Sequence, residues 1–266
     1  MTDRSAQHQE LADALLKAYE TKEAIPPLRD QMDNMTVDDS YAIQQIQEKA
    51  LLARGEKVIG RKIGLTSLAM QKVLGVDSPD FGFMTDDARF IGNDDAHFNS
   101  KDFLQPRIEP ELAFYLKKDL AGPGVTLEDA IDAIDTVHLA IEIVDSRIAD
   151  WNIHLVDTVA DNASYGAIAW SKEPIAMDNL KEDLLNITCK LTVNDEVVGE
   201  GTGADVMGHP AAPLQWLANT LGEQGVALEK GQVVLPGSFC AMIAVDAGTS
   251  VSADYGKYGT FTIHFD

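Results

Sequence analysis

Apolar and polar residues alternate along residues 104–116, LQPRIEPELAFYL, and this alternation predicts a β-strand. Successive side chains of a strand point to opposite faces of the sheet. One face therefore carries Arg107, Glu109, Glu111 and Ala113, and the other carries Ile108, Pro110, Leu112 and Phe114. Two carboxylates share a face about 6.6 Å apart at the backbone, for a rise of roughly 3.3 Å per residue. Two flexible glutamates at this spacing can converge on one cation.

A second strand is predicted over residues 138–144, where Glu142 stands between two isoleucines. Burying an ionised carboxylate without a partner costs on the order of several kcal/mol, so Glu142 needs one. Three strand glutamates with no His or Cys among them are hard oxygen ligands of the kind that bind Mg2+ or Mn2+. The alternative is that Glu142 pairs with Arg147 or Arg107 while the other two glutamates lie on a solvated strand face. The spacing alone leaves both interpretations open.

Two helices are predicted ahead of these strands. The first covers residues 5–19, with one apolar face formed by Leu11, Leu15, Leu16 and Tyr19. The second begins at Thr36, whose hydroxyl can cap it while Asp39 supplies negative charge in the first turn, and it ends near Gly55.

A short strand over residues 58–63 and a short helix from Ser67 to Gly75 follow. We therefore expect a helical N-terminal region over residues 1–75, which acts as a lid or packs against the rest. A β-rich domain is expected over residues 76–266.

The remaining elements are predicted from apolar spacing and turn residues. They are a short helix over residues 126–134 with Thr126 and Asp129 at its start, a hairpin at Asn194–Asp195, a helix that begins at His209–Pro210, and strands over residues 232–235, 241–245 and 260–265. Asp80 and Gly82 are predicted to mark a turn. Four polar residues either line a site or make turns, namely Asp157, Asp161, Asn162 and Ser164.

Two further residues have an ordinary structural interpretation and a functional one. Lys62 stands between Gly60 and Gly64, which would let a ligand or another strand approach the backbone, although a lone strand lysine is ordinarily at the surface. His209 fits a hydrogen-bonding residue at a helix start better than a general base. The nearby glycines at 199, 201 and 203 do not match G-x-G-x-x-G, which excludes a dinucleotide site.

Composition narrows the class of protein. The chain has 266 residues, 45% of them hydrophobic, as in an ordinary globular protein. Its longest apolar run, residues 239–245, is too short to cross a bilayer, and the N-terminus lacks the pattern of a signal peptide. Two cysteines, Cys189 and Cys240, make neither a disulfide framework nor a zinc site. We expect a cytoplasmic protein without a membrane span.

The net charge is −22, from 43 acidic and 21 basic residues. This balance disfavours nucleic acid and anionic membrane as partners, because their phosphates need clustered Lys and Arg. An anionic substrate would have to be captured by a local cation.

Several blocks of residues resemble one family in the same order. They are GRKIGLTS at 60–67, SPDFG at 78–82, QPRIEPELAF at 105–114, EIVDSR at 142–147, DTVADNAS at 157–164, GHP at 208–210 and WLAN at 216–219. The chain resembles the 2-oxo-4-pentenoate (2-hydroxypenta-2,4-dienoate) hydratases and 4-oxalocrotonate decarboxylases, which belong to the fumarylacetoacetate hydrolase fold superfamily. The resemblance runs from about residue 24 to the C-terminus.

The resemblance implies an α+β fold, with a helical N-terminal region followed by a mixed β-roll domain. It implies that Glu109, Glu111 and Glu142 bind Mg2+ or Mn2+ and that Lys62 is the active-site lysine. The residues expected to contact substrate are Asp80, Ser164, Gly237 and Ser238. A homo-oligomer is expected, and a complex with a partner decarboxylase is a further expectation from the family.

The function that the resemblance implies is hydration of 2-hydroxypenta-2,4-dienoate, or a substituted relative, to a 4-hydroxy-2-oxo acid in meta-cleavage aromatic catabolism. The alternatives are a 4-oxalocrotonate decarboxylase, an acylpyruvate hydrolase and a non-catalytic member that supports a partner enzyme. The segment LPGSF at 235–239 looks more like the hydratases, and the block around Lys62 argues against the hydrolase.

Overall fold

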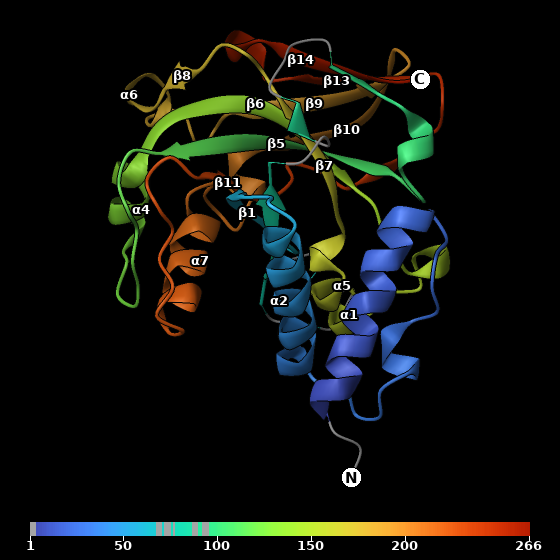
Figure 1. Cartoon of the computed structure of the whole chain (residues 1–266). Coiled ribbons are helices and arrows are strands. Elements are labelled where there is room, and N and C mark those ends of the chain that lie inside the picture. Colours follow the sequence, from blue (N-terminus) through green and yellow to red (C-terminus); the bar gives the residue numbers. More distant parts are fainter. Residues whose placement is uncertain (1–3, 68–70, 72–75, 77, 87–89, 92–95) are drawn as a thin grey trace.

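The chain is described here from a computed structural model that covers residues 4–67, 71, 76, 78–86, 90–91 and 96–266. It has an α+β fold, in which helices precede two β-sheets, as the sequence predicted. In Figure 1 the smaller sheet lies above the larger one, and most helices lie below. The short helix expected between Ser67 and Gly75 falls mostly outside the described residues. Within the described residues, no helix is long and apolar enough to cross a membrane.

Two N-terminal helices, α1 (Arg4–Thr21) and α2 (Val37–Ala53), lie side by side, with the 3-10 turn η1 (Leu28–Asp30) between them in sequence. Thr36 caps α2 as predicted: its hydroxyl accepts from the Asp39 N–H at 3.2 Å, and Asp39 accepts from the Thr36 N–H at 2.9 Å. Their apolar faces pack around Leu15 and against Ile148. The helices are therefore attached to the segment that follows the β-strand carrying Glu142.

The larger sheet has nine strands among the described residues, in the order β2-β1-β11-β5-β6-β7-β3, with β12 beside β5 and β8 beside β6. Its strands are β1 (Val58–Gly64), β2 (Asp80–Thr85), β3 (Phe90–Ile91), β5 (Arg107–Leu116), β6 (Ile134–Val144), β7 (Tyr165–Trp170), β8 (Ile175–Ala176), β11 (Val233–Leu235) and β12 (Ile243–Ala244). The sheet is curled, because β2 near one end contacts β7 near the other. The two predicted glutamate strands, β5 and β6, pair antiparallel at its centre.

The smaller sheet has five strands among the described residues, in the order β10-β9-β13-β14-β4. They are β4 (Ala96–Phe98), β9 (Thr188–Val193), β10 (Glu196–Thr202), β13 (Thr249–Asp254) and β14 (Thr260–Phe265). The hairpin at Asn194–Asp195 is confirmed, and both residues have the positive φ of a tight hairpin turn, 46° and 68°. Strand β13 was not predicted.

The other helical segments are short. They are η2 (Ser100–Asp102), α4 (Leu127–Ala133), η3 (Ala149–Trp151), α5 (Leu155–Ala160), η4 (Asn162–Ser164), α6 (Met177–Leu180), η5 (Gly203–Asp205), α7 (Ala212–Gly222) and η6 (Gly256–Tyr258). The helix α4 has the predicted capping box, formed by Thr126 and Asp129. The helix α7 begins two residues after Pro210, and Pro213 occupies its first turn instead.

Two of the sequence predictions were wrong. Asp80 and Gly82 do not mark a turn but lie in β2, where Gly82 pairs with Lys62 and Asp80 with Gly64. Turn-forming residues are overridden here because the strand is buried and completes the sheet beside β1. The segment around Asp157 is helix α5, although its many polar residues did not predict one.

Alternation along β5 separates the main core from the site. Ile108 and Leu112 belong to the principal apolar cluster, together with Ile263 of the smaller sheet. The opposite, concave face of the curled sheet carries the glutamates.

The domain boundary expected at residue 75 stays a prediction. The strand β1 lies before this position and is already part of the larger sheet.

Candidate active site

Three carboxylates meet on the concave face of the larger sheet. Glu109 of β5 is the direct cross-strand neighbour of Glu142 of β6, and Glu111 lies two residues further along β5. One carboxylate oxygen from each of the three lies within 4.8 Å of the others. The pleat explains this convergence, since residues at i and i+2 share a face and paired strands align their side chains.

The alternative in which Glu142 pairs with Arg147 or Arg107 is wrong. The Arg147 guanidinium binds Asp161, and the Arg107 guanidinium lies 4.3 Å from the centre of the Trp151 ring. Glu142 instead contacts a cation from a distant part of the chain.

That cation is Lys62, which is buried in β1 with 2% of its surface exposed. Its Nζ lies 3.2 Å from Glu142 Oε1 and donates a hydrogen bond to the Ala163 carbonyl at 2.8 Å. Burial by itself lowers the Lys62 pKa, but the negative charge of four nearby carboxylates, led by Glu142 and Asp80, raises it above its usual value. Lys62 is therefore a protonated ammonium inside the carboxylate cluster, in contrast to the solvated surface residue that a lone strand lysine suggests.

The pKa values of the three glutamates are raised, because burial and repulsion from neighbouring carboxylates disfavour their charged forms. Burial, followed by the charge of Glu142, raises the Glu109 pKa to about 7, and the same two causes raise the Glu111 pKa well above its usual value. Burial also raises the Glu142 pKa, although Lys62 opposes this shift. One ammonium does not neutralise this many ionised carboxylates. With all of them ionised the cluster would therefore have an excess of negative charge, and the raised pKa values reflect its tendency to take up a cation or a proton.

This donor set fits a hard divalent cation. Glu111 Oε1 and Glu142 Oε2 are buried and have no hydrogen-bond partner among the described residues. Buried carboxylate oxygens without partners are costly, and a divalent ion would satisfy both their lone pairs and their charge. Glu109, Glu111 and Glu142 are therefore the residues that could hold such an ion.

Loop residues from the C-terminal half hold Glu111 in place. The Gly237 N–H donates to Glu111 Oε2 at 2.8 Å, and the Tyr255 hydroxyl donates to the Glu111 carbonyl at 2.6 Å. Gly237 has φ +116°, and a Cβ there would lie 2.0 Å from Thr66 Oγ1. Sequence reasoning missed Thr66 and Tyr255, because nothing local marks a residue whose role depends on a partner far along the chain.

Of the four residues expected to contact substrate, two adjoin the carboxylate cluster and two have other hydrogen-bond partners. Asp80 is 2% exposed, its charge acts on Lys62, and its Oδ1 has no hydrogen-bond partner among the described residues. Gly237 adjoins the cluster through Glu111. The Ser238 hydroxyl donates to the Cys240 carbonyl at 2.7 Å, and the Ser164 hydroxyl lies 3.2 Å from that of Thr158. Both serines thus have partners other than the carboxylates.

The carbonyl that binds Lys62 belongs to an unusual turn. Asn162, Ala163 and Ser164 of η4 all have left-handed φ angles, 53°, 51° and 54°. This conformation costs roughly 1–2 kcal/mol per non-glycine residue, so surrounding contacts must hold it. One such contact is the Asn162 side chain, which accepts from the Phe83 N–H at 2.9 Å and donates to the Phe83 carbonyl at 3.0 Å. The turn that the polar sequence suggested therefore also lines the site.

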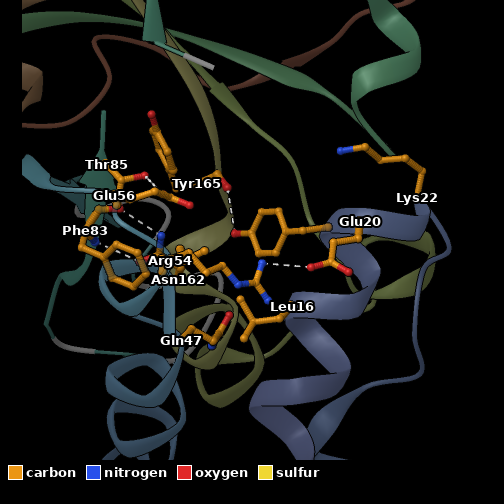
Figure 2. A pocket seen from close by; sticks show the side chains of 12 residues that line it. Leu16, Glu20, Lys22, Gln47, Arg54, Glu56, Phe83, Thr85, Asn162 and Tyr165 are labelled. Carbon is orange, nitrogen blue, oxygen red and sulfur yellow. Dashed lines mark hydrogen bonds and ion pairs between the residues drawn. The ribbon is translucent and has the colours of Figure 1, made fainter. Parts of the chain in front are cut away.

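A separate cavity of about 200 Å³ adjoins this turn on the side of the N-terminal helices. Figure 2 shows Gln47 of α2, Arg54 just after α2, and Phe83 of β2 around it, with Asn162 on its wall. The cavity shares Asn162 with η4 but does not include the three glutamates.

Comparison with known proteins gives consistent results. Residues 61–265 match the family described as Fumarylacetoacetate (FAA) hydrolase C-terminal. The chain is 42% identical over 251 residues to a 2-hydroxyhexa-2,4-dienoate hydratase of Comamonas testosteroni, covering 94% of each protein. It is 41% identical over 261 residues to a 2-keto-4-pentenoate hydratase of Paraburkholderia xenovorans (strain LB400), covering 98% of this chain and 95% of that protein.

Solved structures extend the comparison. A 4-oxalocrotonate decarboxylase from Pseudomonas putida G7, complexed with magnesium and adipate, has a TM-score of 0.94 and 31% identity, covering 100% of this chain and 99% of that one. A fumarylpyruvate hydrolase from Pseudomonas aeruginosa has a TM-score of 0.62 and 14% identity, covering 77% of this chain and 88% of that one, and shows the fold alone.

Proposed function

The chain belongs to the fumarylacetoacetate (FAA) hydrolase C-terminal family, and on that premise we propose that it is a hydro-lyase acting on 2-hydroxypenta-2,4-dienoate or a substituted relative. The reaction adds water to the conjugated acid and gives a 4-hydroxy-2-oxo acid. The observation that supports it best is the buried cluster in which three glutamates converge beside one lysine ammonium. This cluster can hold a divalent ion and place a proton donor next to it.

The glutamates Glu109, Glu111 and Glu142 would hold the ion, which we propose is Mg2+ or Mn2+. When bound, it supplies positive charge that stabilises negative charge on the substrate carboxylate and C2 oxygen. The Gly237 N–H orients Glu111, and the cross-strand pairing of β5 and β6 fixes the other two carboxylates.

Lys62 has two roles in this proposal. Its ammonium offsets the excess negative charge of the cluster, which would otherwise repel an anionic substrate. Its Nζ is also a proton donor whose direction is set by Glu142 and the Ala163 carbonyl. We further propose Asp80, Ser164, Gly237 and Ser238 as substrate contacts. For two of them the proposal draws on proximity to the cluster, since the Asp80 charge acts on Lys62 and the Gly237 N–H donates to Glu111.

Decarboxylation is the second candidate, because loss of CO2 from a 2-oxo acid of this kind also depends on stabilisation of negative charge on the C2 oxygen. The solved decarboxylase is 31% identical to this chain, whereas the two hydratases are 41% and 42% identical, which favours hydration. An acylpyruvate hydrolase is less well supported, since the compared hydrolase is only 14% identical.

One experiment separates these reactions. Purified protein is given 2-hydroxypenta-2,4-dienoate or 4-oxalocrotonate, each with Mg2+ or Mn2+, and the products are identified. We expect the 4-hydroxy-2-oxo acid from the first substrate. Release of CO2 from the second substrate without hydration of the first would assign the decarboxylase instead.

The setting of the enzyme is part of the same proposal. We place it in the cytoplasm, in meta-cleavage catabolism of aromatic compounds, as a homo-oligomer. The molar mass in solution, measured by light scattering, tests the oligomer. Co-elution with a 4-oxalocrotonate decarboxylase tests the complex that the family suggests.

A further inference from the structure

Arg147 is a fully buried arginine whose contacts surround the turn that faces Lys62. Its guanidinium is 0% exposed and forms an ion pair with Asp161, which is 0% exposed as well. Burial of both charges is costly, and a buried ion pair is by itself weak evidence for a gain in stability. The contacts that the guanidinium makes besides this ion pair are therefore the ones that indicate its role.

The guanidinium holds both ends of the left-handed turn η4. It donates to the Asp161 carbonyl on one side at 2.5 Å and to the Tyr165 carbonyl on the other at 2.8 Å. A third donation goes to the Asp145 carbonyl, and the Asp145 N–H in turn donates to the Ser164 carbonyl at 2.8 Å. The fork of an arginine can satisfy several acceptors in fixed directions, which a lysine cannot do.

The first N-terminal helix takes part in the same arrangement. The Tyr19 ring of α1 lies over the Arg147 guanidinium, 4.0 Å from its carbon to the ring centre. The Tyr19 hydroxyl donates to the Tyr165 carbonyl at 3.2 Å. In Figure 2 the Asn162 side chain, which belongs to this turn, lies beside Phe83 of β2.

The direction of the Ala163 carbonyl depends on this arrangement. With its left-handed backbone, Ala163 directs the carbonyl at Lys62 Nζ, 2.8 Å away, and Lys62 is thereby kept 3.2 Å from Glu142. A relaxed right-handed turn would point the carbonyl elsewhere. Lys62 would then keep Glu142 as a partner but lose its second one.

We propose that Arg147 is a positioning residue, which holds η4 between Asp161 and Tyr165 so that the Ala163 carbonyl fixes the Lys62 ammonium at the carboxylate cluster. This inference rests on the proposed function, in which Lys62 acts on the substrate. Arg147 itself contacts neither the cluster nor the substrate.

The first test is Arg147→Lys, which keeps the charge and loses the fork. We expect kcat to fall roughly tenfold to a hundredfold, because small misplacements of a reacting group have effects of this size. KM and the Kd for Mg2+ should stay within about twofold, since the three glutamates are unchanged. The matched control is Arg29→Lys, in a second arginine–aspartate pair of the same region, where Arg29 binds Asp157 at the start of α5. Its kcat should equal that of the parent.

A double-mutant cycle separates positioning from general destabilisation. If Arg147 acts through Lys62, adding Arg147→Lys to Lys62→Met should cause no further loss of kcat. An equal loss of kcat in the parent and in the Lys62→Met background would overturn the proposal.

A second variant covers the case in which Arg147→Lys does not fold. Arg147→Met combined with Asp161→Leu replaces the buried pair by apolar residues, an exchange that buried ion pairs often tolerate. A folded double variant with parental kcat would contradict the proposal.

The variants also distinguish failure of this inference from failure of the proposed function. If Lys62→Met loses activity and the Arg147 variants do not, this inference fails while the proposed function stands. If Lys62→Met keeps parental kcat, the proposed role of Lys62 fails and this inference fails with it.

Discussion

Glu109 and Glu142 face each other across β5 and β6, so two acidic side chains occupy one cross-strand pair. Like charges directly opposite each other destabilise a sheet, and here Glu142 is fully buried while Glu109 is half-buried. Glu111 lies beside this pair, and the Lys62 ammonium is the positive charge next to the three carboxylates. One positive charge does not balance three ionised carboxylates. A divalent cation held by the three glutamates would resolve this conflict.

Glu109→Gln and Glu142→Gln should each lose the divalent metal and, with it, turnover. A neutral amide is a weaker ligand for a hard cation, whereas the fold loses only a repulsive charge. Metal content after dialysis, kcat and the melting temperature are the measurements. Glu200→Gln on the exposed strand β10 is the matched control and should keep both metal and activity. Parental metal content in the two site variants would show that these carboxylates are structural.

Lys62→Met should separate metal binding from catalysis. Methionine keeps the aliphatic stem but removes the ammonium that offsets the negative charge of the cluster. Divalent metal should bind at least as tightly, while kcat falls by roughly a hundredfold or more, as expected for loss of a proton-transfer or electrostatic group. Lys190→Met replaces an exposed strand lysine of β9 and is the control. Near-parental kcat in Lys62→Met, at saturating metal and substrate, would count against this role.

The stability of the metal-free protein should rise as the pH is lowered from 8 towards 6. Burial and the charge of Glu142 raise the folded-state pKa of Glu109 from its ordinary value of 4.5 to about 7. The folded state then binds a proton more tightly than the unfolded chain, so this contribution is present at low pH and is lost as pH rises through about 7. Saturating Mg2+ should flatten the dependence, because the ion takes the place of the proton.

Melting temperatures across this pH range, with and without Mg2+, provide the measurement. Glu109→Gln is the internal control, since it has no proton to gain and should show a shallower pH dependence than the parent. Equal slopes for parent and variant would assign the effect to the general negative charge of the chain.

The sequence predicted those parts of the site that depend on local pattern. Alternation along β5 and β6 placed Glu109, Glu111 and Glu142 correctly, because a period of two in a strand is set by the backbone alone. The contact between Lys62 and Ala163 could not be read in this way, since 101 positions separate them and the pairing depends on how the sheet curls.

One wrong prediction and one backbone conformation that the sequence did not reveal have a similar cause. Asp80 and Gly82 have the residue types of a turn, but β2 completes the buried sheet beside β1, and tertiary pairing decides the conformation. The left-handed turn η4 consists of Asn162, Ala163 and Ser164, two of which rarely adopt this backbone, and the contacts of Arg147 and Phe83 hold it. Such a conformation has no local signature.

Gly237→Ala should impair the site through its backbone, which makes it a test of how Glu111 is held. Gly237 has φ +116°, a Cβ there would lie 2.0 Å from Thr66 Oγ1, and its N–H donates to Glu111 Oε2 at 2.8 Å. The substitution must move the loop, so we expect a lower melting temperature. The Kd for Mg2+ should rise about tenfold or more, since loss of a group that orients a metal ligand typically costs roughly tenfold to a hundredfold in affinity. Gly55→Ala is the control for strain alone, because Gly55 has a similar φ of +101° with nothing within 4 Å of the added Cβ. It should lose stability through the unfavourable φ and keep the parental Kd. Equal metal affinity in both variants would show that the Gly237 N–H does not orient Glu111, and the site would then rely on the pairing of β5 with β6 alone.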